Sequence, residues 1–260
     1  MGVIREDRGR IARLTLNRPE ALNALSMAML RELQEALNAL AEDPEIRVVV
    51  IAAAGRAFCA GHDLAELRAA REAPDGGAAK LKALFDTCSA LMQTLPRLPQ
   101  PVIAEVNGLA TAAGCQLVAS CDLAVAAQGT RFGVNGVNIG LFCSTPMVAL
   151  TRNIARKQAF EMLVTGDFVE AERAQELGLI NRVVAPDDLA RDTMAMAEEI
   201  AAKLSTAVRV GKRAFYAQLE MGLAEAYAHT GEVIVANMMT EDTTEGVAAF
   251  LEKRAPDWAE

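Results

Sequence analysis

Small residues followed by a histidine and an aspartate stand together at residues 58–64, in the order Phe-Cys-Ala-Gly-His-Asp-Leu. The β-branched run at 48–51 before this segment is typical of a buried strand. A helical pattern begins at Asp63, and Glu66 three residues later fits a capping box. Because the first N–H groups of a helix lack partners within it, we expect this turn to attract negative charge.

A second turn of small residues, Leu-Ala-Thr-Ala-Ala-Gly, occupies positions 109–114 after an expected strand at 102–106. One N–H group from each turn could together hold an oxygen that becomes negative during a reaction. Removing one such donor from an enzyme costs roughly 3 kcal/mol of transition-state stabilisation. The two turns therefore predict an oxyanion-binding site made by the main chain.

Motifs for other common chemistries are missing from the chain. It has no Gly-x-Gly-x-x-Gly, no Gly-x-x-x-x-Gly-Lys-Ser/Thr and no Gly-x-Ser-x-Gly, which argues against dinucleotide binding, P-loop chemistry and a hydrolase nucleophile elbow. The two histidines, His62 and His229, are not clustered with cysteines or carboxylates at ligand spacing. We therefore expect no metal site.

Composition restricts the partners and the location. The net charge of −8 argues against nucleic acid, and no apolar run is long enough to span a membrane. The first residues lack the apolar block of a signal peptide. Five cysteines, an odd number without a Cys-x-x-Cys motif, favour free buried thiols over disulfides. We expect a cytoplasmic protein with neither nucleic acid nor membrane as partner.

Strands and helices alternate around the two turns. Strands are expected at 10–17, 46–52, 102–106 and 123–127, and helices at 27–40, 63–71, 81–95 and 114–120. After Pro146 helices dominate, at 147–153, 156–164, 170–177, 187–203, 207–220, 223–238 and 241–252. This order indicates an α/β class, with a core over residues 1–190 and a helical C-terminal region over 191–260, within one folding unit.

These residues resemble the crotonase, or enoyl-CoA hydratase/isomerase, superfamily. The resemblance is carried by Leu-Asn-Arg-Pro-Glu-Ala-Leu-Asn-Ala-Leu at 16–25, the 58–64 segment, Val-Asn-Gly at 106–108, Gly-Cys-Gln-Leu at 114–117, Cys-Asp-Leu-Ala at 121–124 and Phe-Leu-Glu-Lys-Arg at 250–254. Gly-Leu-Phe-Cys-Ser-Thr-Pro at 140–146 looks most like the "enoyl-CoA hydratase domain-containing" branch. The resemblance implies a crotonase-like spiral of ββα turns, with helical C-terminal regions building a homotrimer or a hexamer.

The resemblance also implies a ligand, an acyl-CoA thioester that is the substrate, with no separate cofactor. Its carbonyl oxygen would lie between the N–H groups of His62 and Ala113, so that charge drawn onto this oxygen makes the thioester enolate-like. Matching positions place the CoA portion beside Arg18, Ala24, Ala60, Asp63, Leu64, Gly114, Phe250 and Lys253. For Lys253, a solvated charge at a helix end is an equally good interpretation.

The chain departs from the hydratases at both of their catalytic glutamates, whose positions hold Gln116 and Gly136. Glutamine does not exchange a proton at neutral pH and glycine has no side chain, so hydration by paired carboxylates is not expected. The second oxyanion donor is Ala113, where many relatives have glycine. Alanine suits that position only with a negative φ.

Several side chains near the turns have two interpretations. The imidazole of His62 could move protons, although the family uses the N–H at this position. Asp63 and Glu66 fit a helix cap better than a base, Cys143 fits a buried thiol better than a nucleophile, and Asn135 fits a loop turn. Three functions remain open: a lyase or isomerase with a displaced acid/base residue, a decarboxylase of the methylmalonyl-CoA type, and a non-catalytic acyl-CoA-binding protein.

Overall fold

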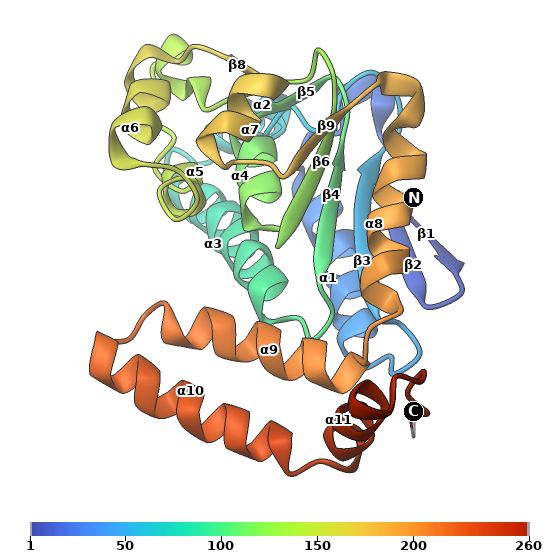
Figure 1. Ribbon diagram of the computed structural model, residues 1–260. Coiled ribbons are helices and arrows are strands. Elements are labelled where there is room, and N and C mark those ends of the chain that lie inside the picture. The colour runs from blue at the N-terminus through green and yellow to red at the C-terminus, as the bar shows by residue number, and fades with distance from the viewer. Residues whose placement is uncertain (1, 259–260) are drawn as a thin grey trace.

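The computed structural model describes residues 2–258 and has an α/β architecture built on two sheets (Figure 1). The larger sheet has six strands in the order β1-β2-β3-β4-β6-β9. Its neighbouring strands are parallel except in the β1–β2 hairpin. The strands are β1 (Val3–Arg8), β2 (Ile11–Leu16), β3 (Val48–Ala53), β4 (Val102–Val106), β6 (Leu123–Ala127) and β9 (Arg182–Val184).

The smaller sheet contains β5 (Leu109–Thr111), β7 (Arg131–Gly133) and β8 (Val169–Glu170), in the order β5-β7-β8. Strand β5 follows β4 directly and leads into helix α4 (Ala113–Ser120). In the same way, β7 follows β6 and precedes helix α5 (Pro146–Leu150). Each of these turns adds one strand to each sheet and then a helix, which confirms the expected crotonase-like ββα spiral.

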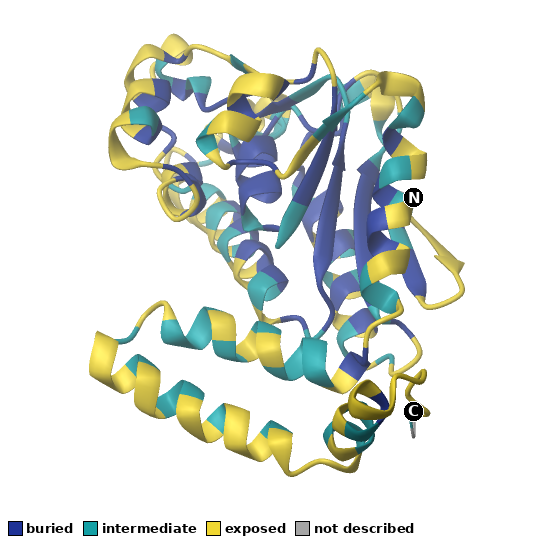
Figure 2. Cartoon of the chain, in the orientation of Figure 1, coloured by how far each residue is buried: buried dark blue, intermediate teal, exposed yellow. Residues whose placement is uncertain are grey.

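Both faces of the larger sheet are covered by helices, because its inner strands are apolar on both sides. Side chains alternate between the faces of a strand. In β3, Val50 packs in the cluster that faces α8, and Ile51 packs in the larger cluster on the other face. Figure 2 shows the resulting buried sheet between its helical layers. These layers are α1 (Met27–Ala41), α3 (Ala78–Arg97) and α4 on one face and α8 (Leu189–Ala201) on the other.

In helix α1, the sequence pattern determines both the N-terminal cap and the face that is buried. Its first turn is capped by Ser26, whose hydroxyl oxygen accepts the N–H of Met29 at 3.2 Å. Leu30, Leu33 and Leu37 follow at helical spacing and are fully buried. The predicted cap and apolar face are both confirmed.

The differences from the predicted elements are concentrated in short segments. Strands β5, β7, β8 and β9 have two or three residues each, too few to produce a periodic pattern. Strand β1 was not predicted, because it is an edge strand with five exposed residues out of six.

The other helices are α2 (Leu64–Ala70), α6 (Arg156–Thr165), α7 (Ala171–Leu177), α9 (Ser205–Gln218), α10 (Leu223–Met238) and α11 (Glu241–Glu252), with 3-10 turns η1 (Pro19–Ala21), η2 (Asn135–Ile139) and η3 (Pro186–Asp188).

The helices α9–α11 lie below the sheets in Figure 1. A largely buried polar cluster joins α9 to the core. Lys212 of α9 donates from Nζ to Asp122 Oδ2 at 2.6 Å and to the carbonyl oxygens of Leu95 and Gln100. Tyr216, one turn later, donates to the other oxygen of Asp122 at 2.8 Å. Burial lowers the pKa of Lys212, and the adjacent Asp122 carboxylate opposes that effect. Asp122 therefore anchors α9, and its Oδ2 also accepts the N–H of Val102 in β4 at 2.6 Å.

Within residues 2–258, every helix is too short or too polar to cross a membrane. Over the same range, no three side chains of the His, Cys, Asp and Glu types are grouped as a metal ion would require.

Candidate oxyanion site

The two small-residue turns lie side by side because the segment after β3 pairs with β5. Cys59 and Ala110 form a parallel bridge. The N–H of Cys59 donates to the Leu109 carbonyl at 3.0 Å, and the N–H of Thr111 donates back to the Cys59 carbonyl at 3.0 Å. This pairing carries the chain into residue 62 on one side and residue 113 on the other, so the two predicted donors come from adjacent segments.

Two glycines allow the turns to approach this closely. Gly61 has a φ of +90°, and a Cβ there would lie 3.0 Å from the Cβ of Ala112. A Cβ on Gly114 would lie 2.2 Å from the Cys59 carbonyl oxygen, which is far inside contact distance. Neither position therefore accepts a side chain without moving the backbone of the site.

The N–H groups of His62 and Ala113 are both without an internal acceptor among residues 2–258. Ala113 is the first residue of α4, so its N–H is one of the donors that a helix cannot satisfy and lies at the positive end of the helix dipole. The positive φ falls on Ala112, at 49°, and not on Ala113, so the condition that alanine imposes at 113 is met.

The imidazole of His62 is held inside the protein by two contacts. Nδ1 lies 3.2 Å from the carbonyl oxygen of Leu25, a contact in which Nδ1 must carry the proton and donate. The ring packs edge-on against Phe85 of α3, with centroids 5.1 Å apart. Burial lowers the pKa of His62, although the Leu25 carbonyl and the charge of Glu66 act in the opposite direction. The side chain is therefore a neutral imidazole whose Nε2 is buried without a partner among the described residues.

Asp63 caps α2 as predicted, but the capping box does not form. One carboxylate oxygen of Asp63 accepts the N–H groups of Ala65 and Glu66 at 3.1 and 3.3 Å. The carboxylate of Glu66 instead accepts the N–H of Met27 at 2.9 Å and so caps α1. Sequence spacing could not reveal this contact, because the two residues are 39 positions apart.

The predicted CoA-contacting residues of the N-terminal part gather beside the turn at 60–63. Leu25 donates its N–H to the Gly61 carbonyl at 2.7 Å, and Ala60 donates to the Leu22 carbonyl at 3.0 Å. Arg18 donates to the Ser26 hydroxyl at 3.1 Å, and its guanidinium is 3.7 Å from the Asp63 carboxylate. These contacts bring together the members of the predicted set that precede α4, namely Arg18, Ala24, Ala60, Asp63 and Leu64. Leu64 is 57% exposed there.

Phe250 and Lys253 are not brought to this site within one chain. Phe250 is in α11 and Lys253 ends that helix with a φ of 58°. In Figure 1, α11 lies at the opposite end of the molecule from α2 and β5. Phe250 is 82% exposed. Their predicted contact with the CoA portion therefore needs a second chain.

Gln116 and Gly136, the positions at which the resemblance implies the two glutamates, have different surroundings. Gln116 is buried, and its Oε1 has no hydrogen-bond partner among residues 2–258. Gly136 donates its N–H to Cys143 Sγ at 3.4 Å. A Cβ on Gly136 would lie 2.8 Å from the Leu141 carbonyl oxygen and 2.9 Å from Cys143 Sγ. The space beside Gly136 is thus closed by the segment 141–143, and Gln116 holds an unsatisfied amide oxygen.

Two further features of the site had no sequence signal. Ala112 adopts a backbone conformation (φ 49°, ψ −118°) that favours glycine, and an alanine gives no warning of it. Thr111 Oγ1 and Asn135 Oδ1 are 2.6 Å apart, so the hydroxyl donates and fixes the orientation of the amide.

Nucleophilic thiols are not part of this arrangement. All five cysteines are free and buried. Burial raises the pKa of Cys59 and of Cys115 to about 12. Burial also raises the pKa of Cys143, against the effect of its contact with the Gly136 N–H. The thiols are therefore protonated at neutral pH, which agrees with the interpretation of Cys143 as a buried thiol.

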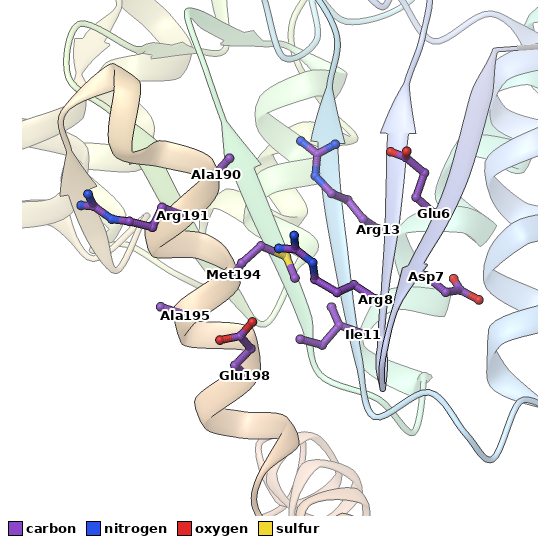
Figure 3. A pocket seen from close by; sticks show the side chains of 10 residues that line it. All are labelled: Glu6, Asp7, Arg8, Ile11, Arg13, Ala190, Arg191, Met194, Ala195 and Glu198. Atoms are coloured by element: carbon purple, nitrogen blue, oxygen red, sulfur yellow. The ribbon is translucent and has the colours of Figure 1, made fainter.

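Two cavities in the described part of the chain lie elsewhere. The larger, of about 620 Å³, is an open groove between α8 and the β1–β2 hairpin (Figure 3). The smaller, of about 250 Å³, lies beside Lys212 and Tyr216. Neither is lined by residues of the two turns.

A ββα spiral in which two adjacent turns offer free main-chain donors defines a crotonase-like protein. The chain belongs to the enoyl-CoA hydratase/isomerase family, whose pattern matches residues 6–260. It is 46% identical to enoyl-CoA hydratase domain-containing protein 3, mitochondrial, of Xenopus laevis, over 98% of this chain and 85% of the relative. These matches confirm the predicted superfamily and its branch.

Solved structures agree with this assignment. The crystal structure of an enoyl-CoA hydratase from Mycobacterium smegmatis has a TM-score of 0.96 at 54% identity and covers 100% of both chains. The crystal structure of human enoyl-CoA hydratase domain-containing protein 3 has a TM-score of 0.94 at 43% identity, covering 99% of this chain and 100% of the other.

The same relatives correct one prediction. The curated relatives at 44–46% identity, from Xenopus laevis to Homo sapiens, are named mitochondrial, which contradicts the expected cytoplasmic location. The prediction was based on buried thiols and on the first residues of the chain. Thiols report on redox state and do not distinguish one reducing compartment from another.

Proposed function

We propose that the chain binds an acyl-CoA thioester and stabilises its enolate between the N–H groups of His62 and Ala113. The observation that carries this proposal is the pair of unsatisfied main-chain donors that the Cys59–Ala110 bridge brings to adjacent segments. The thioester is a substrate, so the reaction needs no resident cofactor. Family membership supports a lyase or isomerase acting on CoA thioesters.

Both donors act on the oxygen where negative charge develops. When electron density moves from the α-carbon to the thioester oxygen, two fixed N–H groups stabilise that oxygen without reorganising. Each donor is worth roughly 3 kcal/mol in comparable sites. The neutral imidazole of His62 packs against Phe85 in this mechanism, and only the N–H of the residue faces the reaction.

A decarboxylase is the second candidate, because the positions 116 and 136 offer no carboxylate base. In that reaction the bond between the α-carbon and a carboxylate breaks and CO2 leaves. The electron pair of the broken bond passes into the enolate. A proton from water then adds to the α-carbon. The closed surroundings of Gly136 favour this reaction over hydration, which needs two acid/base groups.

Self-association completes the proposed site. Helix α10 has no buried residue in a single chain. Its exposed apolar side chains include Leu223, Tyr227, Ile234, Val235 and Met238. An apolar helix face of this kind is typical of an interface. We propose a homotrimer, alone or paired as a hexamer, in which α11 of one copy brings Phe250 and Lys253 to the CoA portion bound by another.

A ligand-side experiment tests the oxyanion site without altering the protein. Isothermal titration calorimetry compares butyryl-CoA with S-butyl-CoA, a thioether that lacks the carbonyl oxygen. Loss of both hydrogen bonds is expected to weaken binding by about 10-fold or more. Equal affinities would show that the carbonyl oxygen is not held, and no binding of either compound would refute the ligand class.

A further inference from the structure

The N–H of His62 belongs to a peptide group whose other end is held by a distant segment. The peptide bond between Gly61 and His62 is trans. In a planar trans peptide the carbonyl and the N–H point in opposite directions. The N–H of Leu25 donates to the Gly61 carbonyl at 2.7 Å. This hydrogen bond therefore restrains the direction in which the His62 N–H points.

The residues 22–27, here called the supporting segment, hold the turn at two more points. The N–H of Ala60 donates to the Leu22 carbonyl at 3.0 Å. The carbonyl oxygen of Leu25 lies 3.2 Å from His62 Nδ1, so the same residue holds the imidazole and the peptide group. A shift of the supporting segment would consequently re-aim the donor.

Asn23 fixes the supporting segment from inside the protein. It has a φ of 53°, in the left-handed region that asparagine tolerates better than most residues. Its side chain is fully buried, and Nδ2 donates to the carbonyl oxygens of Ala54 and Ala57 at 2.9 and 2.8 Å. Its Oδ1 accepts the N–H of Arg18 at 2.8 Å. One amide thus ties the supporting segment to the chain that leads into the turn.

Glu66 holds the other end of the supporting segment. Its carboxylate accepts the N–H of Met27 at 2.9 Å. Glu66 belongs to α2, which begins two residues after His62. The contacts of Asn23 and Glu66 therefore lie on either side of Leu25 and keep it opposite the turn.

We propose that Asn23 and Glu66 are positioning residues, which hold Leu25 so that the His62 N–H is aimed at the thioester oxygen. Neither side chain touches the ligand. A buried amide gains little net free energy from hydrogen bonds that replace those to water, so the contribution of Asn23 is the geometry that it imposes. This inference rests on the proposed function, because it needs the thioester oxygen at the His62 N–H.

Calorimetric titration of the full-length protein with butyryl-CoA and S-butyl-CoA measures how well the carbonyl oxygen is held. Asn23→Gly lets the backbone keep its left-handed conformation and removes the amide. Glu66→Met keeps the length of the side chain and removes the acceptor. We expect each variant to lose about 5-fold of the wild-type preference for the thioester, which corresponds to one hydrogen bond, with the affinity for S-butyl-CoA unchanged.

Two further variants separate aiming from stability. Glu66→Gln keeps an acceptor for the Met27 N–H and should retain the wild-type preference. Glu72→Met, at an exposed position just after α2, is the matched control and should also retain it. A merely structural role of Asn23 and Glu66 would lower the melting temperature and leave the ratio of the two affinities intact.

The outcomes distinguish this inference from the proposed function. If Asn23→Gly or Glu66→Met is folded by circular dichroism and retains the full preference, the inference is overturned and the proposed function stands. Should Asn23→Gly not fold, Glu66→Met decides alone. Equal binding of the two compounds by the wild type would refute the proposed oxyanion site, and the inference would fail with it.

Discussion

At the scale of single residues, the backbone of Ala112 shows how the donor at 113 is aimed. Its φ of 49° and ψ of −118° belong to a region that glycine tolerates and that residues with a Cβ rarely adopt. A non-glycine residue in such a region costs of the order of 1–3 kcal/mol. The strain is maintained by the contact of Ala112 N–H with the Gly133 carbonyl at 2.9 Å and by the start of α4.

We expect Ala112→Gly to raise the free energy of unfolding by about 1 kcal/mol, since relief of the strain exceeds the added entropy of the unfolded chain. Chemical denaturation at neutral pH measures the change. Ala112→Val serves as the opposite control, because a β-branched residue should be less stable than alanine there. A loss of stability in the glycine variant would show that the alanine is not strained.

A buried histidine makes stability depend on pH. Burial lowers the pKa of His62 below the value of about 6.5 that the unfolded chain shows. As the pH falls below that value, the unfolded chain takes up a proton that the folded protein does not. The free energy of unfolding should therefore decrease from pH 6.5 toward the folded-state pKa, by at most about 1.4 kcal/mol per pH unit.

His62→Gln tests this prediction, because the amide can still donate to the Leu25 carbonyl but does not titrate. Urea denaturation at pH 7.5 and pH 5.5 should show a smaller loss of stability on acidification for the variant than for the wild type. The same loss in both proteins would mean that other groups cause the acid sensitivity.

At the scale of elements, the length of each strand or helix determined whether the sequence pattern could predict it. The bounds of β4, β6, α10 and α11 agree with the predicted ranges, because each has a clear apolar run or helical period. The strands β5, β7 and β8 were missed, although the pairing of β5 is what brings the segment that leads to Ala113 next to the segment that leads to His62. The pairing of residues 59 and 110 is a long-range contact, and local pattern carries no information about it.

The same limit applies to the candidate site. Spacing was enough to find the two turns and the Asp63 cap, and the resemblance to the family directed attention to positions 116 and 136. It could not reveal that Glu66 caps α1, that Leu141 and Cys143 close the space at Gly136, or that Gln116 lacks a partner. Each of these facts depends on where distant segments meet.

A largely buried ion pair contributes to the attachment of helix α9 to the core. The side chain of Lys212 is 7% exposed, and its contact with Asp122 is 2.6 Å. We expect Lys212→Met to lower the free energy of unfolding by about 3–5 kcal/mol, because it leaves the Asp122 carboxylate buried without a counter-charge. Thermal and urea denaturation measure the effect, and Lys157→Met at an exposed position of α6 is the matched control. Equal stability of the two variants would contradict the anchoring role.

At the scale of the whole molecule, the residues of the proposed site lie at two opposite ends of the folded chain. The donor pair, Arg18 and Asp63 lie at the end of the sheets, whereas Phe250 and Lys253 belong to the helical region at the opposite end. Under the proposed function, a single chain would therefore hold the thioester but not both ends of the CoA portion. The exposed apolar residues of α10 give a physical reason for copies to associate through that helical region.

Assembly and CoA affinity should consequently be lost together. Replacing Ile234 and Val235 by aspartate places two charges in the apolar face of α10, where both side chains are more than half exposed in one chain. We expect this double variant to become monomeric in size-exclusion chromatography with light scattering, and to bind butyryl-CoA at least about 10-fold more weakly by calorimetry. Ile4→Asp on edge strand β1 is the control and should change neither quantity. A monomeric variant with full affinity would show that each chain builds a complete CoA site, and a monomeric wild type would remove the reason for α11 to act across copies.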